Sequence, residues 1–231
     1  MYWYWDATYI FVIIGALISA LASWNVNRTF KKFNECFNRR GMMAEDVAAL
    51  IMRGADITDV RIERIGGKLT DHYSPAEKVL RLSNSVYGST SIAALGVAAH
   101  ECGHAIQHKV GYLPLKLRSL SVPVANIGSK LSWPVILVGI IIGQMGIARI
   151  GVVLFGLVVL FQLITLPVEF NASRRALEIL EEREILADEE LSGAAKVLKA
   201  AALTYVAALF STILQLLRLL ILTRNGGRRR D

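Results

Sequence analysis

The sequence predicts an α+β membrane protein that is mostly helical, with three or four transmembrane helices and a small sheet in its polar part. Its hydrophobic fraction of 54% and its mean hydropathy of +0.44 exceed those of ordinary soluble proteins. The excess is concentrated in long apolar blocks, as in membrane spans. A polar stretch between the first two blocks contains alternating apolar and polar residues, followed by a helix-like run.

The first apolar block, residues 7–24, carries no charged side chain and ends at Trp24. Aromatic residues also precede it, as is typical of a segment anchored at both membrane interfaces (Tyr2, Trp3, Tyr4, Trp5). The stretch before it holds Asp6 and no lysine or arginine, so we interpret the block as a retained anchor and not a cleaved signal peptide. Basic residues follow at once, which places the N-terminus outside and the chain from Asn25 onward in the cytoplasm.

The second apolar block, residues 131–167, is interrupted by a glycine-rich turn at 143–146 and predicts a hairpin of two spans. The third block, residues 200–222, allows two interpretations. If it spans the membrane, the arginines between 224 and 230 lie outside, against the positive-inside rule. Otherwise it lies in the interface or packs against the hairpin with Arg218 toward protein.

Two helices are expected in the polar stretch. Residues 44–53 have the pattern of a short amphipathic helix, which Gly54 ends. An apolar run at 91–99 predicts the second helix, and residues 88–91 (Gly-Ser-Thr-Ser) supply candidates for its N-cap.

The same stretch predicts a sheet of two or three strands. Residues 60–65 and 78–83 alternate apolar and polar side chains, and a Gly-Gly turn leads from the first run into 68–70. Leu80–Val86 is our candidate for an edge strand to which a peptide substrate could add. The alternative is a strand that only packs against the helix after it.

An H-E-x-x-H motif occupies residues 100–104 in the second helix. His100 and His104 are four positions apart, so they share one helix face and can bind one Zn²⁺ as neutral imidazoles. Glu101 is suited to activate a metal-bound water. A chance match would leave ordinary surface histidines, but three of the four histidines of the chain lie within residues 100–108.

The net charge of +7 comes largely from two basic runs next to apolar blocks. These runs are Arg28, Lys31, Lys32, Arg39 and Arg40, and Arg224, Arg228, Arg229 and Arg230. Membrane lipids with anionic headgroups are their expected partners, and no interleaving of aromatic residues indicates nucleic acid. Cys36 and Cys102 make a poor disulfide pair because Cys102 lies inside the motif helix, which favours a reducing cytoplasmic compartment.

The third zinc ligand must come from elsewhere, because catalytic zinc usually takes three protein ligands and a water. His108 lies roughly 12 Å from His100 along an unbroken helix, which is too far to share the ion. Glu169 stands where the membrane hairpin returns to the side of the motif helix. It is our candidate ligand, and the alternative is an interfacial carboxylate at a helix start.

Residues 169–176 resemble the E-F-x-A-D-R segment of membrane zinc peptidases of the HtpX and CAAX-processing type. The distant Glu after H-E-x-x-H resembles the gluzincin arrangement. Residues 67–73, the motif and residues 167–177 together are similar to the "putative neutral zinc metallopeptidases" of bacterial membranes, the YugP-like family. This resemblance covers most of the chain and implies Glu169 as the third ligand. Ser173 replaces the Asp of the HtpX pattern, which leaves open whether this position bonds to a ligand histidine.

The sequence therefore predicts an integral zinc metalloendopeptidase of the cell membrane whose site faces the cytoplasm. Glu101 takes a proton from the water, which attacks the peptide carbonyl, and returns the proton to the leaving amine. His72, or second to it Tyr73, is a candidate donor to the oxyanion, although each can equally be a structural hydrogen bonder. Peptides or membrane proteins are the expected substrates. The alternative function is a non-catalytic membrane scaffold with a structural zinc site. Such a site normally has four protein ligands, most of them cysteines.

These interpretations divide the chain into five segments. They are an N-terminal anchor, a zincin-like cytoplasmic catalytic part, a transmembrane hairpin, a cytoplasmic helix with the third ligand, and a C-terminal hydrophobic helix with a basic tail. Their ranges are, in that order, residues 1–24, 25–130, 131–168, 169–199 and 200–231.

Overall fold

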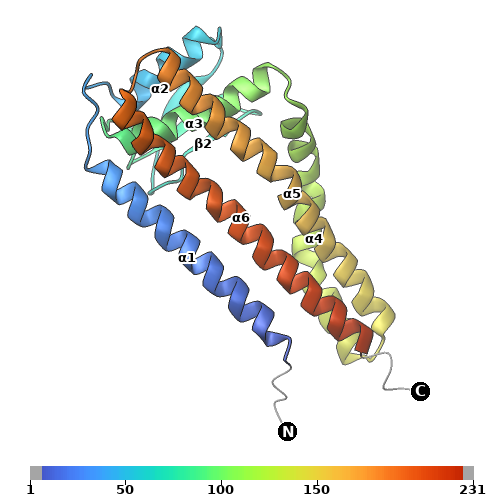
Figure 1. Ribbon diagram of the computed structural model, residues 1–231. Coiled ribbons are helices and arrows are strands. Elements are labelled where there is room, and N and C mark those ends of the chain that lie inside the picture. The colour runs from blue at the N-terminus through green and yellow to red at the C-terminus, as the bar shows by residue number, and fades with distance from the viewer. Residues whose placement is uncertain (1–6, 226–231) are drawn as a thin grey trace. The chain divides into compact units, whose positions relative to one another are not determined.

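A computed structural model of the protein describes residues 7–225 (Figure 1). The elements in chain order are α1 (Tyr9–Asn34), α2 (Ala44–Gly54), β1 (Arg61–Ile65), β2 (His72–Ser74), β3 (Val79–Ser83), α3 (Ile92–Lys109), α4 (Leu113–Ile141), α5 (Met145–Glu182) and α6 (Asp188–Asn225). Long helices predominate and one small sheet accompanies them, so the predicted α+β class is confirmed.

Within the described residues, four helices are long and apolar enough to cross a membrane: α1, α4, α5 and α6. The first three are the spans that the sequence predicts, and the turn of the hairpin contains Gly143, whose φ of 70° suits glycine. By length and hydropathy, α6 qualifies as a fourth span. The aromatic residues at 2–5 and the arginines at 228–230 lie outside the described residues.

The chain forms two compact units, and the long helices contribute to both. One unit contains α1 up to Ser23, residues 117–166 and α6 from Thr204. The other contains residues 24–116 and 167–203, and therefore holds the sheet, α2, α3 and the motif.

In the first unit, the α4–α5 hairpin packs through small residues, as is common between membrane helices. A Cβ added to Gly128 of α4 would lie 2.6 Å from the carbonyl oxygen of Leu154 on α5. The guanidinium of Arg218 on α6 lies 4.1 Å from the centre of the Tyr9 ring. This charged group is therefore directed at protein, where a cation and an aromatic face attract each other.

The sheet of the second unit has the order β1–β3–β2. β3 pairs in parallel with β1 and antiparallel with β2. The Gly66–Gly67 turn therefore does not close a hairpin, and the short run expected at 68–70 is not a strand. The second strand along the chain begins later, at His72.

The prediction that Leu80–Val86 is an edge strand is wrong, because β3 has a partner on each side. Its burial explains the central place: Val79, Leu80, Leu82 and Ser83 are all fully buried. A strand whose two faces are both covered suits the middle of a sheet. The free edges belong to β1 and β2.

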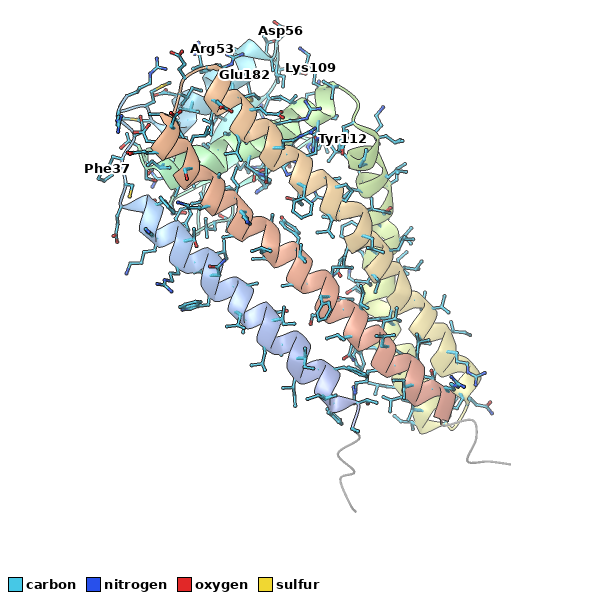
Figure 2. The ribbon with its side chains drawn as sticks, in the orientation of Figure 1. Phe37, Arg53, Asp56, Lys109, Tyr112 and Glu182 are labelled. Atoms are coloured by element: carbon cyan, nitrogen blue, oxygen red, sulfur yellow. The ribbon has the colours of Figure 1, made fainter. Side chains whose placement is uncertain are left out.

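The core of the second unit lies where α2, α3 and the sheet meet. Its largest fully buried side chains include Val47 and Ile51 of α2, Leu80 of β3 and Leu95 of α3. The far end of α3 is tied to the turn after α2, because the Lys109 ammonium donates a hydrogen bond to the Asp56 carbonyl at 2.8 Å (Figure 2). The motif helix is thus held along its whole length.

Candidate metal centre

The H-E-x-x-H motif lies in α3, which is unbroken from Ile92 to Lys109. Ser91 caps its first turn as predicted, since its hydroxyl accepts the N–H of Ala94 at 3.1 Å. His100 and His104 lie one turn apart, with ring centres 4.8 Å apart and ring planes at 84°. Continuous helix geometry therefore directs both imidazoles to one point.

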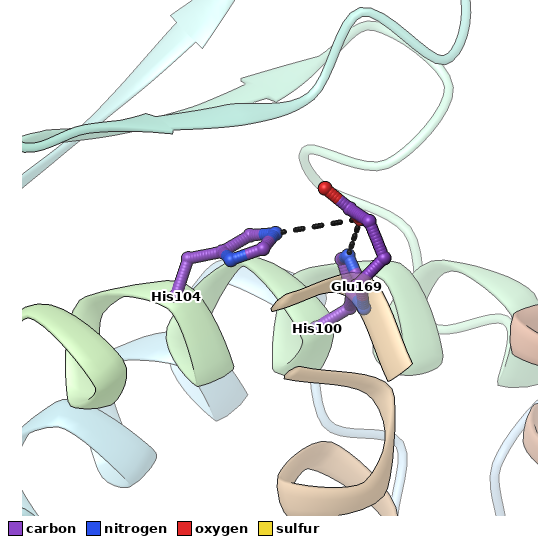
Figure 3. A group of neighbouring side chains, drawn as sticks. All are labelled: His100, His104 and Glu169. Atoms are coloured by element: carbon purple, nitrogen blue, oxygen red, sulfur yellow. Dashed lines mark ion pairs between the residues drawn. The ribbon is translucent and has the colours of Figure 1, made fainter. Parts of the chain in front are cut away.

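Glu169 of α5 reaches the same point (Figure 3). Its Oε2 lies 3.3 Å from Nε2 of His100 and 3.7 Å from Nε2 of His104. One donor atom from each residue lies within 4.8 Å of the others. The Glu169 side chain is deeply buried, with the residue 2% exposed. The structure thus brings together the three residues that the sequence singled out as zinc ligands.

Each histidine is oriented through its other ring nitrogen. Nδ1 of His100 lies 3.1 Å from the Ser173 hydroxyl, and Nδ1 of His104 lies 3.0 Å from the side-chain oxygen of Gln107. These contacts fix the ring planes and leave both Nε2 atoms facing Glu169. Ser173 therefore makes the bond that the sequence left open, with a hydroxyl in place of a carboxylate.

Gln107 connects the two helices that supply the ligand residues. It is fully buried, and its amide nitrogen donates to the Val168 carbonyl at 2.8 Å and to the side-chain oxygen of Asn171 at 2.9 Å. Because both amide protons are used, the amide oxygen must accept the Nδ1–H of His104, which fixes the tautomer of that ring. The H-E-x-x-H pattern does not predict this role, although Gln107 lies one helical turn beyond His104.

The surroundings of His104 favour positive charge. Burial by itself lowers the pKa of this imidazole, but the carboxylates of Glu169 and Glu101 outweigh burial and raise the pKa above its usual value. A cation placed between the ligand residues would experience the same attraction.

Zinc fits this donor set. Two imidazole nitrogens and one carboxylate oxygen, with room for a water, are typical of catalytic zinc. With bonds of about 2.0–2.1 Å, tetrahedral geometry places donor atoms roughly 3.3–3.4 Å apart. The carboxylate-to-imidazole distances of 3.3 and 3.7 Å lie near this spacing, and all three donor atoms lie within 4.8 Å of one another.

Cys102 lies inside the motif but faces away from the site. It is fully buried, and its Sγ lies 3.6 Å from the Ala48 carbonyl of α2. Burial raises the pKa of this thiol far above its usual value, so the thiol stays neutral and is a poor metal ligand. Cys102 therefore lies outside the group of His100, His104 and Glu169.

Glu101 lies next to the ligand group without belonging to it. Its Oε2 accepts the backbone N–H of Tyr73 on β2 at 2.9 Å. The Tyr73 hydroxyl in turn lies 2.8 Å from Nδ1 of His108. His108 therefore packs with Tyr73, one turn beyond His104, and lies outside the group of His100, His104 and Glu169.

The structure does not bring His72 to this group. Its Nδ1 bonds to the Thr70 carbonyl at 2.9 Å, and its Nε2 lies 3.5 Å from the guanidinium of Arg81 on β3. Successive side chains of a strand point to opposite faces. Since Tyr73 contacts α3, its neighbour His72 faces the other way. Of the two residues considered for the oxyanion, Tyr73 is the one beside the motif helix.

The chain is similar to proteins that are described as zinc metallopeptidases or membrane proteases. The model of the family described as "Putative neutral zinc metallopeptidase" matches residues 8–224. This chain belongs to that family. A protein of Bacillus subtilis (strain 168) with the name "Putative membrane protease YugP" is 42% identical over 219 residues, which cover 94% of this chain and 97% of that protein. No solved structure is significantly similar to the chain.

Proposed function

We propose that this member of the family is an integral membrane endopeptidase that depends on zinc. The observation that carries the proposal is the convergence of His100, His104 and Glu169 next to a carboxylate, Glu101, that is not part of the ligand group. A purely structural zinc site would be closed by a fourth protein ligand, usually a cysteine. Among the described residues no fourth His, Cys, Asp or Glu joins this group, and Cys102 is directed toward α2.

Zn²⁺ held by these three side chains would activate a water for attack on a peptide carbonyl. Glu101 would accept the proton of that water and later transfer it to the leaving amine. The hydrogen bond from the Tyr73 N–H holds the carboxylate in place, and only 8% of Glu101 is exposed. A carboxylate that is held in place and shielded from solvent suits a general base that accepts a proton from the water and then transfers it to the leaving amine.

The edge strand β2 offers a place for the substrate. The amide of Tyr73 is directed to Glu101 and not to β3, so the free edge of β2 borders the motif. A peptide that adds to this edge as a further strand would bring a backbone carbonyl past Glu101. Peptides or membrane proteins are therefore the substrates that we propose.

The site faces the cytoplasm in our proposal, and the protein crosses the cell membrane several times. The basic residues that follow the apolar part of α1 support this orientation (Arg28, Lys31, Lys32, Arg39, Arg40). The same cations would interact with anionic membrane lipids.

Glu101→Gln tests the proposed function. The variant keeps the size of the side chain and removes its ability to take a proton, so casein cleavage should fall by roughly 100-fold or more. Bound zinc, measured on the detergent-purified protein, should equal that of the parent. Glu182→Gln is the matched control on an exposed carboxylate and should cleave normally. Cleavage by Glu101→Gln at the parent rate would show that the assigned mechanism is wrong.

A further inference from the structure

A groove of about 420 Å³ lies between α1 and α6 in the second unit, away from the metal centre. Four of its lining residues are cations: α1 supplies Arg28 and Lys32, and α6 supplies Lys196 and Lys199. Each pair is spaced by one helical turn, so its members share a helix face. The lining residues, all in the described part of the chain, include no Asp or Glu.

Phe33 holds the two sides of this groove together. The ammonium groups of Lys32 and Lys196 lie 5.5 and 5.9 Å from the centre of its ring, which is within range of a cation–π attraction. The ring fits against α6 because residue 193 is glycine: a Cβ there would lie 2.9 Å from the Phe33 ring. The cations of the two helices are therefore held close together despite their mutual repulsion.

The groove begins where α1 leaves its apolar segment. Trp24 closes that segment, and the Arg28 guanidinium lies 5.1 Å from the centre of its ring. Tryptophan and arginine in this arrangement are typical of the level of the lipid headgroups. The lining also contains the apolar Ala200 and Leu203 and the polar Asn25 and Thr29. The groove thus combines a cationic part with an apolar part, as an amphiphilic ligand requires.

We propose that this groove binds the phosphate of an acidic phospholipid, with the acyl chains toward Leu203. Lysine and arginine each strengthen binding to anionic lipid by about fivefold when they lie near the membrane surface. A phosphodiester with a net negative charge relieves the repulsion among the four cations. A zwitterionic headgroup brings an ammonium into the same cluster and binds less well.

The test compares two double variants of the full chain that lose the same charge. Lys196→Gln with Lys199→Gln changes the groove, and Arg53→Gln with Lys68→Gln changes exposed cations that neither line it nor belong to the two basic runs. Detergent-purified proteins are titrated with short-chain phosphatidylglycerol and with phosphatidylcholine, and bound lipid is counted by native mass spectrometry. We expect phosphatidylglycerol to bind the groove variant roughly 10- to 30-fold more weakly than the parent, and the control variant within about threefold.

Equal losses in both variants would overturn the proposal, because they would indicate diffuse attraction to net charge. Equal binding of the two lipids by the parent would overturn it as well. A parallel titration with inorganic phosphate distinguishes the sources of the anion: binding as tight as that of phosphatidylglycerol would assign the groove to a soluble phosphate. The readout does not depend on proteolysis or zinc, and unchanged zinc content verifies that each variant is folded.

Discussion

Gly103 of α3 packs directly against the backbone of Ala172 on α5. A Cβ added to Gly103 would lie 2.6 Å from the Ala172 carbonyl oxygen and 3.1 Å from its Cα. The contact is one residue from His104 and less than one turn from Glu169. Two helices that meet without intervening side chains have little freedom to move apart. The distance between the imidazoles and the carboxylate is therefore set by a backbone contact.

Gly103→Ala should weaken the metal centre without changing any ligand. The added methyl forces α3 and α5 apart, at a cost of about 1–3 kcal/mol of stability. We expect a lower melting temperature and zinc affinity reduced by roughly tenfold or more. Gly156→Ala is the control, because nothing lies within 4 Å of a Cβ at that position of α5. If Gly103→Ala binds zinc like the parent, the close contact does not set the ligand spacing.

Gln107→Met should reduce zinc affinity by roughly 10- to 100-fold, the range typical of residues that orient a ligand histidine. The substitution keeps the length of the side chain but removes its bonds to His104, Val168 and Asn171. Competition of the purified variant with a zinc chelator measures the change. Gln215→Met, on α6, is the control and should bind zinc normally. If Gln107→Met binds zinc as tightly as the parent, the fixed tautomer of His104 does not contribute to zinc affinity.

The sequence predicts those parts of the site that depend on local geometry. The spacing of His100 and His104 requires only a helix, and Ser91 caps that helix as expected. The same helix geometry argues against His108 as a ligand, because an unbroken helix holds it too far from His100. Only the return of the hairpin and a family resemblance predict Glu169, since no local rule connects it to α3.

Other features depend on contacts that leave no local pattern. The central place of β3 results from pairing with strands on both sides, whereas the glycines at 66 and 67 resemble a hairpin turn. The amide of Gln107 binds the carbonyl of Val168, and a backbone acceptor has no sequence signature. For the same reason the sequence does not predict the Tyr73 N–H that holds Glu101, and it favours the neighbouring His72 as the candidate donor.

Reporter fusions test the orientation of the site in the membrane. The basic residues between Arg28 and Arg40 should be cytoplasmic by the positive-inside rule, and Glu169 must lie on the same side as the motif helix. Fusions of a reporter after Arg40 and after Arg175 should therefore both report the cytoplasm. Opposite sides for the two fusions would separate Glu169 from the histidines and exclude a shared zinc site.

Removal of Glu169 should affect zinc far more than removal of any orienting residue. Glu169→Ala deletes a bond to the ion and a buried charge that offsets the dication, so zinc affinity should fall well beyond the roughly 10- to 100-fold typical of orienting residues. His108→Ala should retain its zinc, because the His108 ring bonds to the Tyr73 hydroxyl at 2.8 Å. Glu181→Ala, an exposed carboxylate on the same helix as Glu169, is the matched control.

Metal analysis of the detergent-purified variants decides between the two candidate ligands. Zinc should also raise the melting temperature of the parent, since an ion at 100 times its dissociation constant stabilises the folded state by about 2.7 kcal/mol. Chelation should abolish this shift in the parent, and Glu169→Ala should show little shift at the same zinc concentration. Full zinc in Glu169→Ala together with loss of zinc in His108→Ala would mean that His108 is the third ligand. That outcome would require α3 to break after His104, because an unbroken helix holds His108 too far from His100 to share the ion.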